Sequence, residues 1–179
     1  LGFKISEIML EGSTEELKKT KVTQPSIFIF SVILSKLLNK SFKPDAVAGH
    51  SLGEFSALAA VEGISFSEGL LLVKKRAEAM HDACELTKGT MAAILGMKDK
   101  SVEDICNNVK EVVVAANFNC PGQVVISGEF NAVQNTCEKL IKEGAKRAIL
   151  LPVHGAFHSP LMNSAKKELE KAINNTSFK

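Results

Sequence analysis

Residues 49–54 have the types and spacing of a serine nucleophile. Their sequence is Gly-His-Ser-Leu-Gly-Glu, a G-x-S-x-G pattern with Ser51 at its centre. Such a serine is exposed where a strand turns sharply into a helix, and Gly49 and Gly53 would let the backbone crowd together at that turn. Ser51 is therefore the candidate nucleophile. The backbone N–H of Leu52, directly after it, is a candidate donor to a developing oxyanion.

The flanking sequence predicts the required strand, turn and helix. Residues 45–48, Asp-Ala-Val-Ala, follow a turn at Pro44 and predict a short buried strand. Residues 52–61 are rich in helix formers and predict the helix after the serine. Two further helices are predicted, one with Thr23 as N-cap and Pro25 in its first turn, and one over residues 67–86 with Ser67 as N-cap. We find no strand upstream of Thr23, where this kind of fold normally has one.

The pattern changes after Gly89. Strands are predicted at residues 90–95, 112–117, 123–127 and 147–151, and helices at 101–109 and 131–143. This β-α-β-β-α-β order is typical of a ferredoxin-like domain. Another amphipathic helix begins at Ser159-Pro160, so the small domain is expected to be inserted into a larger one. We expect a large subdomain at 1–88, a small one at 89–151 and a return to the large one at 152–179.

Composition excludes several classes of function. The chain has 179 residues, 45% apolar composition and a net charge of +2, which favours a globular protein and gives no reason to expect nucleic acid as a partner. No apolar run is long enough to predict a membrane span, and no signal segment is evident. The four cysteines are widely spaced, which favours reduced thiols over a disulfide framework or a metal site. A cytoplasmic location is expected.

A serine nucleophile needs a base, and the chain has four histidines. His154 and His158 lie in a loop before a capped helix, and either could be the base. His50 is expected to point away from Ser51 and to be structural or to line the pocket, and His81 to be solvated. No acidic partner for a hydrolase triad stands out between the serine and these histidines.

Six segments together resemble a known family, the malonyl-CoA:acyl carrier protein transacylases among the acyltransferases of fatty-acid and polyketide synthesis. The segments are Gln24-Pro25 and residues 49–54, 75–80, 89–94, 117–128 and 155–159. The resemblance implies an α/β fold, with an α/β-hydrolase-like large subdomain and an inserted ferredoxin-like small one. It also implies that malonyl-CoA and acyl carrier protein are the partners, with CoA thioester as a substrate and no cofactor. We expect a monomer.

The resemblance assigns roles to several residues. Ser51 would carry the malonyl group as an oxyester in a ping-pong reaction, and His158 would be its base, oriented without a carboxylate. Arg76 would hold the malonyl carboxylate through a two-pronged hydrogen bond. Without the resemblance, Arg76 would be a solvated helix arginine. Asn117 and Asn119 are expected to line the cleft between the subdomains, each with the alternative of a polar strand end.

The chain also departs from the family. The glutamine loop that supplies a second oxyanion donor is not found near the N-terminus, and the family's C-terminal region is not found after Lys179. We therefore expect a partial chain. It could belong to a discrete enzyme or to a multidomain synthase. Two alternatives stay open, a serine esterase of the α/β-hydrolase class and a noncatalytic fragment that binds the carrier protein.

Overall fold

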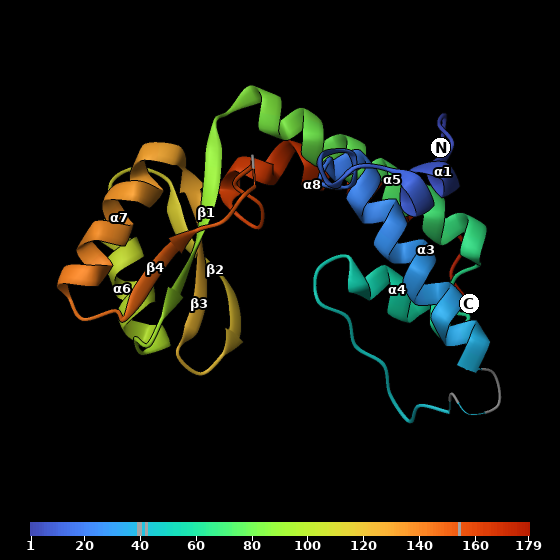
Figure 1. Cartoon of the computed structure of the whole chain (residues 1–179), viewed down its shortest axis with the longest axis horizontal. Coiled ribbons are helices and arrows are strands. Elements are labelled where there is room, and N and C mark those ends of the chain that lie inside the picture. The colour runs from blue at the N-terminus through green and yellow to red at the C-terminus, as the bar shows by residue number, and fades with distance from the viewer. Residues whose placement is uncertain (39–40, 42, 154) are drawn as a thin grey trace. The chain divides into compact units, whose positions relative to one another are not determined.

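The candidate serine and the sheet lie in different parts of the molecule. The computed structural model describes residues 1–38, 41, 43–153 and 155–179. They divide into a first unit, Leu1–His81 with Lys167–Lys179, and a second unit, Asp82–Lys166 (Figure 1). Among the described residues all strands belong to the second unit, whereas the first unit is helical.

The second unit is a four-stranded antiparallel sheet with two helices. Its elements are β1 (Gly89–Leu95), α6 (Asp99–Asn107), β2 (Val113–Cys120), β3 (Gln123–Glu129), α7 (Phe130–Lys142) and β4 (Arg147–Leu150). The strand order is β2-β3-β1-β4, and each neighbouring pair is antiparallel. The elements occur in the order that the sequence predicts, because alternating side chains and local turns specify each of them.

Both helices of the second unit cover the same face of its sheet (Figure 1). Ala92 and Ile94 of β1 alternate with residues of the other face, as the two-residue period of a strand requires. They pack with Val124 and Ile126 of β3. The helices add their buried residues Val102, Cys106, Ala132, Val133 and Leu140 to the same core. The second unit therefore has a hydrophobic core of its own, formed by the sheet and its two helices.

The cysteines of the second unit differ sharply in their expected reactivity. Burial raises the pKa of the Cys106 thiol to about 11 and that of Cys137 to about 11, whereas Cys120 is exposed at the end of β2. Because the thiolate is the reactive form, iodoacetamide at neutral pH should alkylate Cys120 first and leave Cys106 and Cys137 unmodified. Peptide mapping of the alkylated protein measures this, and denaturant should expose all four cysteines. Early modification of Cys106 would contradict the observed core.

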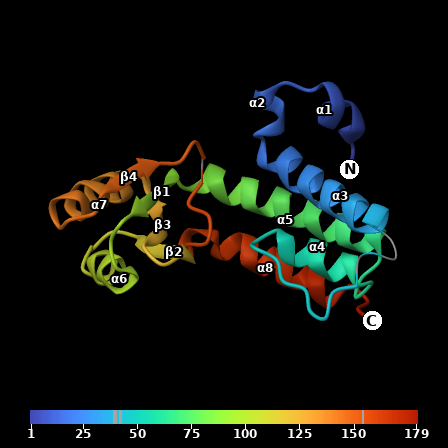
Figure 2. The same cartoon turned by 60° about the horizontal axis from the view of Figure 1, so that its bottom comes forward.

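The first unit is built from helices. They are α1 (Ile5–Glu11), α2 (Thr14–Leu17), α3 (Thr20–Leu38), α4 (Gly53–Ala60) and the greater part of α5 (Phe66–Leu86), joined by the end of α8 (Asn163–Asn174), which follows the short 3-10 helix η2 (Pro160–Met162). Figure 2 shows α5 running alongside α3 and α4, and all three helices contribute to one core. Phe28, Phe55 and Val73, one from each helix, meet in the core. The serine pattern is therefore anchored at the start of α4 on this helical core.

Three local expectations for the first unit are wrong. Residues 45–48 form no strand, because a strand needs a neighbour to satisfy its backbone groups and no described segment pairs with them. The helix α3 begins at Thr20, so Pro25 lies inside it. At the start of α5, Ser65 takes the capping role expected of Ser67, because its hydroxyl accepts from Glu68 N at 3.1 Å.

The helix α3 has a property that the apolar runs of the sequence did not reveal. By length and composition it could cross a membrane, a test that core helices of soluble proteins also meet. Its buried side carries Gln24 beside Phe28 and Val32, so a polar group is held within the packed face. Phe28 and Val32 pack in the core with α4 and α5. The other large apolar residues of this helix are exposed, namely Ile27, Phe30, Ile33, Leu34, Leu37 and Leu38.

Candidate active site

Ser51 lies in a strained turn that leads directly into α4. Its φ of 54° is in the left-handed region, which few residues other than glycine adopt. The turn is closed by backbone hydrogen bonds from Gly53 N to His50 O at 2.9 Å and from Phe55 N to Leu52 O at 3.1 Å. Strain of this kind persists where the surrounding structure enforces it, and it is typical of a nucleophile at the entrance to a helix.

The two glycines of the turn have different roles. A Cβ atom on Gly49 would lie 1.9 Å from the carbonyl carbon of Gly53 and 2.2 Å from Glu54 N, whereas a Cβ on Gly53 would meet no described atom within 4 Å. The expected crowding is therefore present, but only Gly49 has to lack a side chain.

Gly49→Ala should destabilise the chain by about 3 kcal/mol, because backbone atoms cannot move aside as a flexible side chain can. Denaturant unfolding of the two variants measures the difference. Gly53→Ala is the matched control and should stay within about 0.5 kcal/mol of the parent. Equal loss in both variants would contradict the packing described for the turn.

Arg76 of α5 is brought to Ser51 within the first unit. Its Nη2 donates to Ser51 Oγ at 2.9 Å, and its Nη1 donates to Gln24 Oε1 at 2.5 Å. Arg76 is 9% exposed, although its neighbour Lys75 is in solvent. The alternative of a solvated helix arginine is therefore wrong.

The environment of Arg76 is unusual for a cation. Burial lowers the pKa of its guanidinium, and the charge of Glu54 in the first turn of α4 opposes that shift. Neither the hydroxyl nor the amide that accepts the hydrogen bonds described above carries a charge to neutralise this buried guanidinium. Such a group favours a ligand that brings a carboxylate, because a planar fork binds both carboxylate oxygens.

His158 lies in the second unit, at the end of a tightly packed loop. A Cβ on Gly155 would lie 2.3 Å from Cys84 Sγ, and one on Gly89 would lie 2.5 Å from the Cβ of Ala156, so the loop approaches these residues closely. Ser159 Oγ donates to Ala156 O at 2.6 Å. His158 itself is exposed, with a φ of 58°. The close packing of the loop therefore restricts the backbone that carries the exposed His158 imidazole.

The other predicted residues lie in the turn and on the edge of the sheet. His50 is exposed in the turn, and Leu52 is buried with its backbone at the N-cap of α4. Asn117 and Asn119 lie on β2, where Asn119 Nδ2 donates across the hairpin to Gln123 Oε1 at 3.2 Å. His154 lies outside the described residues. No group of three described His, Cys, Asp or Glu side chains could hold a metal ion.

Gln24 belongs to a segment that resembles the family, but the sequence predicted no role for it at the site. It is 52 residues from Arg76 along the chain, and periodicity carries no information about such a contact. One signal was present in the sequence. Gln24 stands among apolar residues on the packed side of α3, and a buried amide needs hydrogen-bond partners.

Comparison with known proteins gives consistent similarities. Residues 1–178 match the family model described as acyl transferase domain. The malonyl CoA-acyl carrier protein transacylase of Bacillus subtilis is 42% identical over 183 residues, which cover 100% of this chain and 58% of that protein. The chain thus spans little more than half the length of this relative.

Solved structures agree with the sequence similarity. The acyl-carrier-protein S-malonyltransferase of Burkholderia pseudomallei has a TM-score of 0.94 and 39% identity, and the match covers 100% of this chain and 60% of that one. A malonyl-transacylase solved in complex with its type II PKS acyl-carrier protein has a TM-score of 0.95 and 35% identity, covering 99% and 59%. Both are α/β proteins, as the described chain is.

Proposed function

The chain belongs to the acyl transferase domain family, and we propose that it transfers a malonyl group from malonyl-CoA to the phosphopantetheine thiol of an acyl carrier protein. The observation that carries this proposal is the buried Arg76, which donates to Ser51 Oγ at the start of α4. A nucleophile and a carboxylate-binding cation in direct contact suit an acyl group with a carboxylate at its far end.

The proposed reaction has two half-reactions. Ser51 Oγ attacks the thioester carbonyl carbon while His158 takes its proton, the C–S bond breaks, and the CoA thiolate receives that proton. The carrier thiol gives its proton to His158 and attacks the ester carbonyl carbon, the C–O bond to Ser51 breaks, and Ser51 Oγ takes a proton back from His158. The Leu52 N–H stabilises the oxyanion in both steps. This chemistry needs no cofactor, since CoA thioester is itself the substrate.

The remaining roles extend the same proposal. His50 of the first unit and Asn117 and Asn119 of the second unit are proposed to bind substrate. Residues 89–151 act as an inserted ferredoxin-like subdomain, for which the antiparallel β2-β3-β1-β4 order is the support. The rest belongs to an α/β-hydrolase-like large subdomain. We infer a monomeric cytoplasmic protein, and the four unpaired cysteines suit a reducing compartment.

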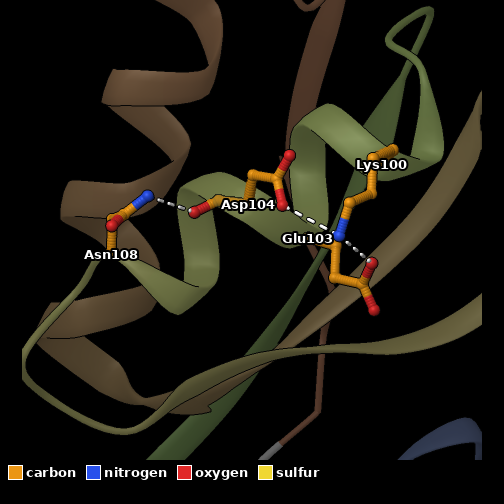
Figure 3. A network of polar contacts seen from close by, with 4 residues as sticks. All are labelled: Lys100, Glu103, Asp104 and Asn108. Atoms are coloured by element: carbon orange, nitrogen blue, oxygen red, sulfur yellow. Dashed lines mark hydrogen bonds and ion pairs between the residues drawn. The ribbon is translucent and has the colours of Figure 1, made fainter.

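An acidic carrier protein would meet lysines and one arginine of the second unit. Lys142, Lys146 and Arg147 are exposed there. Lys100 is a weaker candidate, because its ammonium contacts Asp104 Oδ1 at 2.9 Å and Glu103 Oε2 at 3.2 Å (Figure 3). The hydrogen bond to Asp104 is the first cause that raises the pKa of Lys100. Because two carboxylates already pair with the Lys100 ammonium, it would attract an acidic partner only weakly.

Intact-mass spectrometry after incubation with malonyl-CoA or acetyl-CoA tests the proposal. A stable malonyl adduct on Ser51, formed in preference to an acetyl adduct, is the expected result. Rapid hydrolysis of the adduct would instead indicate an esterase. An unlabelled chain that still binds acyl carrier protein would indicate a noncatalytic binding role.

A further inference from the structure

We propose that Gln24 is a positioning residue for Arg76, and that its neutral amide sets the preference for an acyl group that ends in a carboxylate. The inference rests on the proposed function, because it requires Arg76 to be the site of that carboxylate. It concerns a residue that does not itself touch the reacting atoms.

The contacts form a continuous series within the first unit. Gln24 Nε2 donates to Met80 Sδ at 3.4 Å, Gln24 Oε1 accepts from Arg76 Nη1, and Arg76 Nη2 donates to Ser51 Oγ. Only this orientation of the amide is chemically consistent, because a guanidinium has no acceptor and a thioether has no donor. The series therefore links α3 to the candidate nucleophile through α5.

Burial makes the Gln24 contact consequential. Gln24 is 7% exposed and Arg76 is 9% exposed, so solvent cannot readily replace the amide oxygen if it is removed. Loss of that oxygen leaves an Nη group of a buried cation without this partner. The guanidinium plane then loses the anchor that fixes it relative to Ser51, and its two-pronged geometry toward a carboxylate is lost with it.

The neutrality of Gln24 is the second part of the inference. A carboxylate at this position would also accept from Nη1, but it would cancel the charge of Arg76 before a substrate arrived. Glu54 already acts on Arg76 from α4 and opposes the lowering of its pKa by burial. An amide instead holds the guanidinium in place and leaves its charge for the substrate.

Two variants of Gln24 separate its positioning of the Arg76 guanidinium from the effect of its neutral charge. Gln24→Met keeps an unbranched side chain of similar size but has no amide oxygen, and Gln24→Glu keeps an oxygen acceptor but adds a charge. Calorimetric titration of malonyl-CoA and acetyl-CoA is carried out in a Ser51→Ala background, where no acyl transfer can occur. Both variants should bind malonyl-CoA about 10- to 100-fold more weakly and acetyl-CoA within about twofold of the parent.

Ser26→Ala is the matched control on the same helix. The Ser26 hydroxyl is buried and has no hydrogen-bond partner among the described atoms, so its removal should leave both affinities unchanged. Thermal unfolding of each variant checks that α3 stays packed. Gln24→Glu retains a hydrogen bond to Arg76, so its loss of malonyl binding without loss of stability would be difficult to attribute to misfolding.

Arg76→Ala distinguishes failure of this inference from failure of the proposed function. If Arg76→Ala binds malonyl-CoA as well as the parent, or if the parent binds neither thioester, the proposed function is wrong and the inference is overturned with it. If Arg76→Ala loses the malonyl preference while Gln24→Met keeps it, only the inference is overturned. Nitrogen-15 NMR of the Arg76 guanidinium adds a readout that needs no substrate. Its Nη groups should rotate faster in Gln24→Met, and unchanged rotation would also overturn the positioning role.

Discussion

Ser51→Ala is expected to abolish the malonyl adduct that malonyl-CoA leaves on the protein. The variant has no Oγ, so no oxyester can form. Transfer to a carrier thiol should fall by roughly 10⁶-fold, the order of loss when a serine nucleophile is deleted from its catalytic group. Intact-mass spectrometry measures the adduct, and a coupled assay of carrier acylation measures the rate.

The backbone of Ser51 provides an internal control for this result. Its φ of 54° is costly for any residue with a Cβ and free of that cost for glycine. Ser51→Gly should therefore be about 1 kcal/mol more stable than Ser51→Ala, since both lack the hydroxyl that Arg76 contacts. Both variants should be equally inactive. A malonyl adduct that persists in either variant would place the nucleophile elsewhere.

The sequence predicted the second unit far better than the first. Its strands and helices alternate over short distances, and each is specified by local periodicity and turn residues, so the observed β1–α6–β2–β3–α7–β4 order follows the prediction. The strand predicted at residues 45–48 is absent because a strand forms only beside a partner strand, and the composition of four residues does not specify a partner. The short helices α1 and α2 were missed because seven and four residues carry little periodicity.

The residues of the candidate site also differ in how they could be predicted from the sequence. Ser51 and Leu52 follow from a local pattern, which fixes a turn without reference to the rest of the chain. Arg76 followed only from a family resemblance, because an arginine that follows two lysines on a helix is ordinarily solvated. Its burial, and its contact with Gln24, arise from the packing of α3 against α5, and no single segment encodes that packing.

Arg76→Ala is the second variant with a large expected effect. The malonyl carboxylate would lose a buried cation that binds it through two hydrogen bonds, so kcat/KM for malonyl-CoA should fall by about 100-fold or more. Labelling by acetyl-CoA should fall much less or rise, because a neutral acyl group would no longer leave a buried charge unpaired. The ratio of malonyl to acetyl adduct, measured by mass spectrometry in one competition mixture, reports this change directly.

Arg76→Lys separates charge from geometry in the same competition experiment. Lysine keeps the positive charge but has a single ammonium, so it cannot hold a carboxylate through a planar fork or reach Gln24 and Ser51 together in the same way. Its malonyl preference should lie between those of the parent and Arg76→Ala, about 10-fold below the parent. If Arg76→Lys matched the parent, the charge alone would determine the preference and the fork would be dispensable. If Arg76→Ala kept the preference, the carboxylate would be bound by another group.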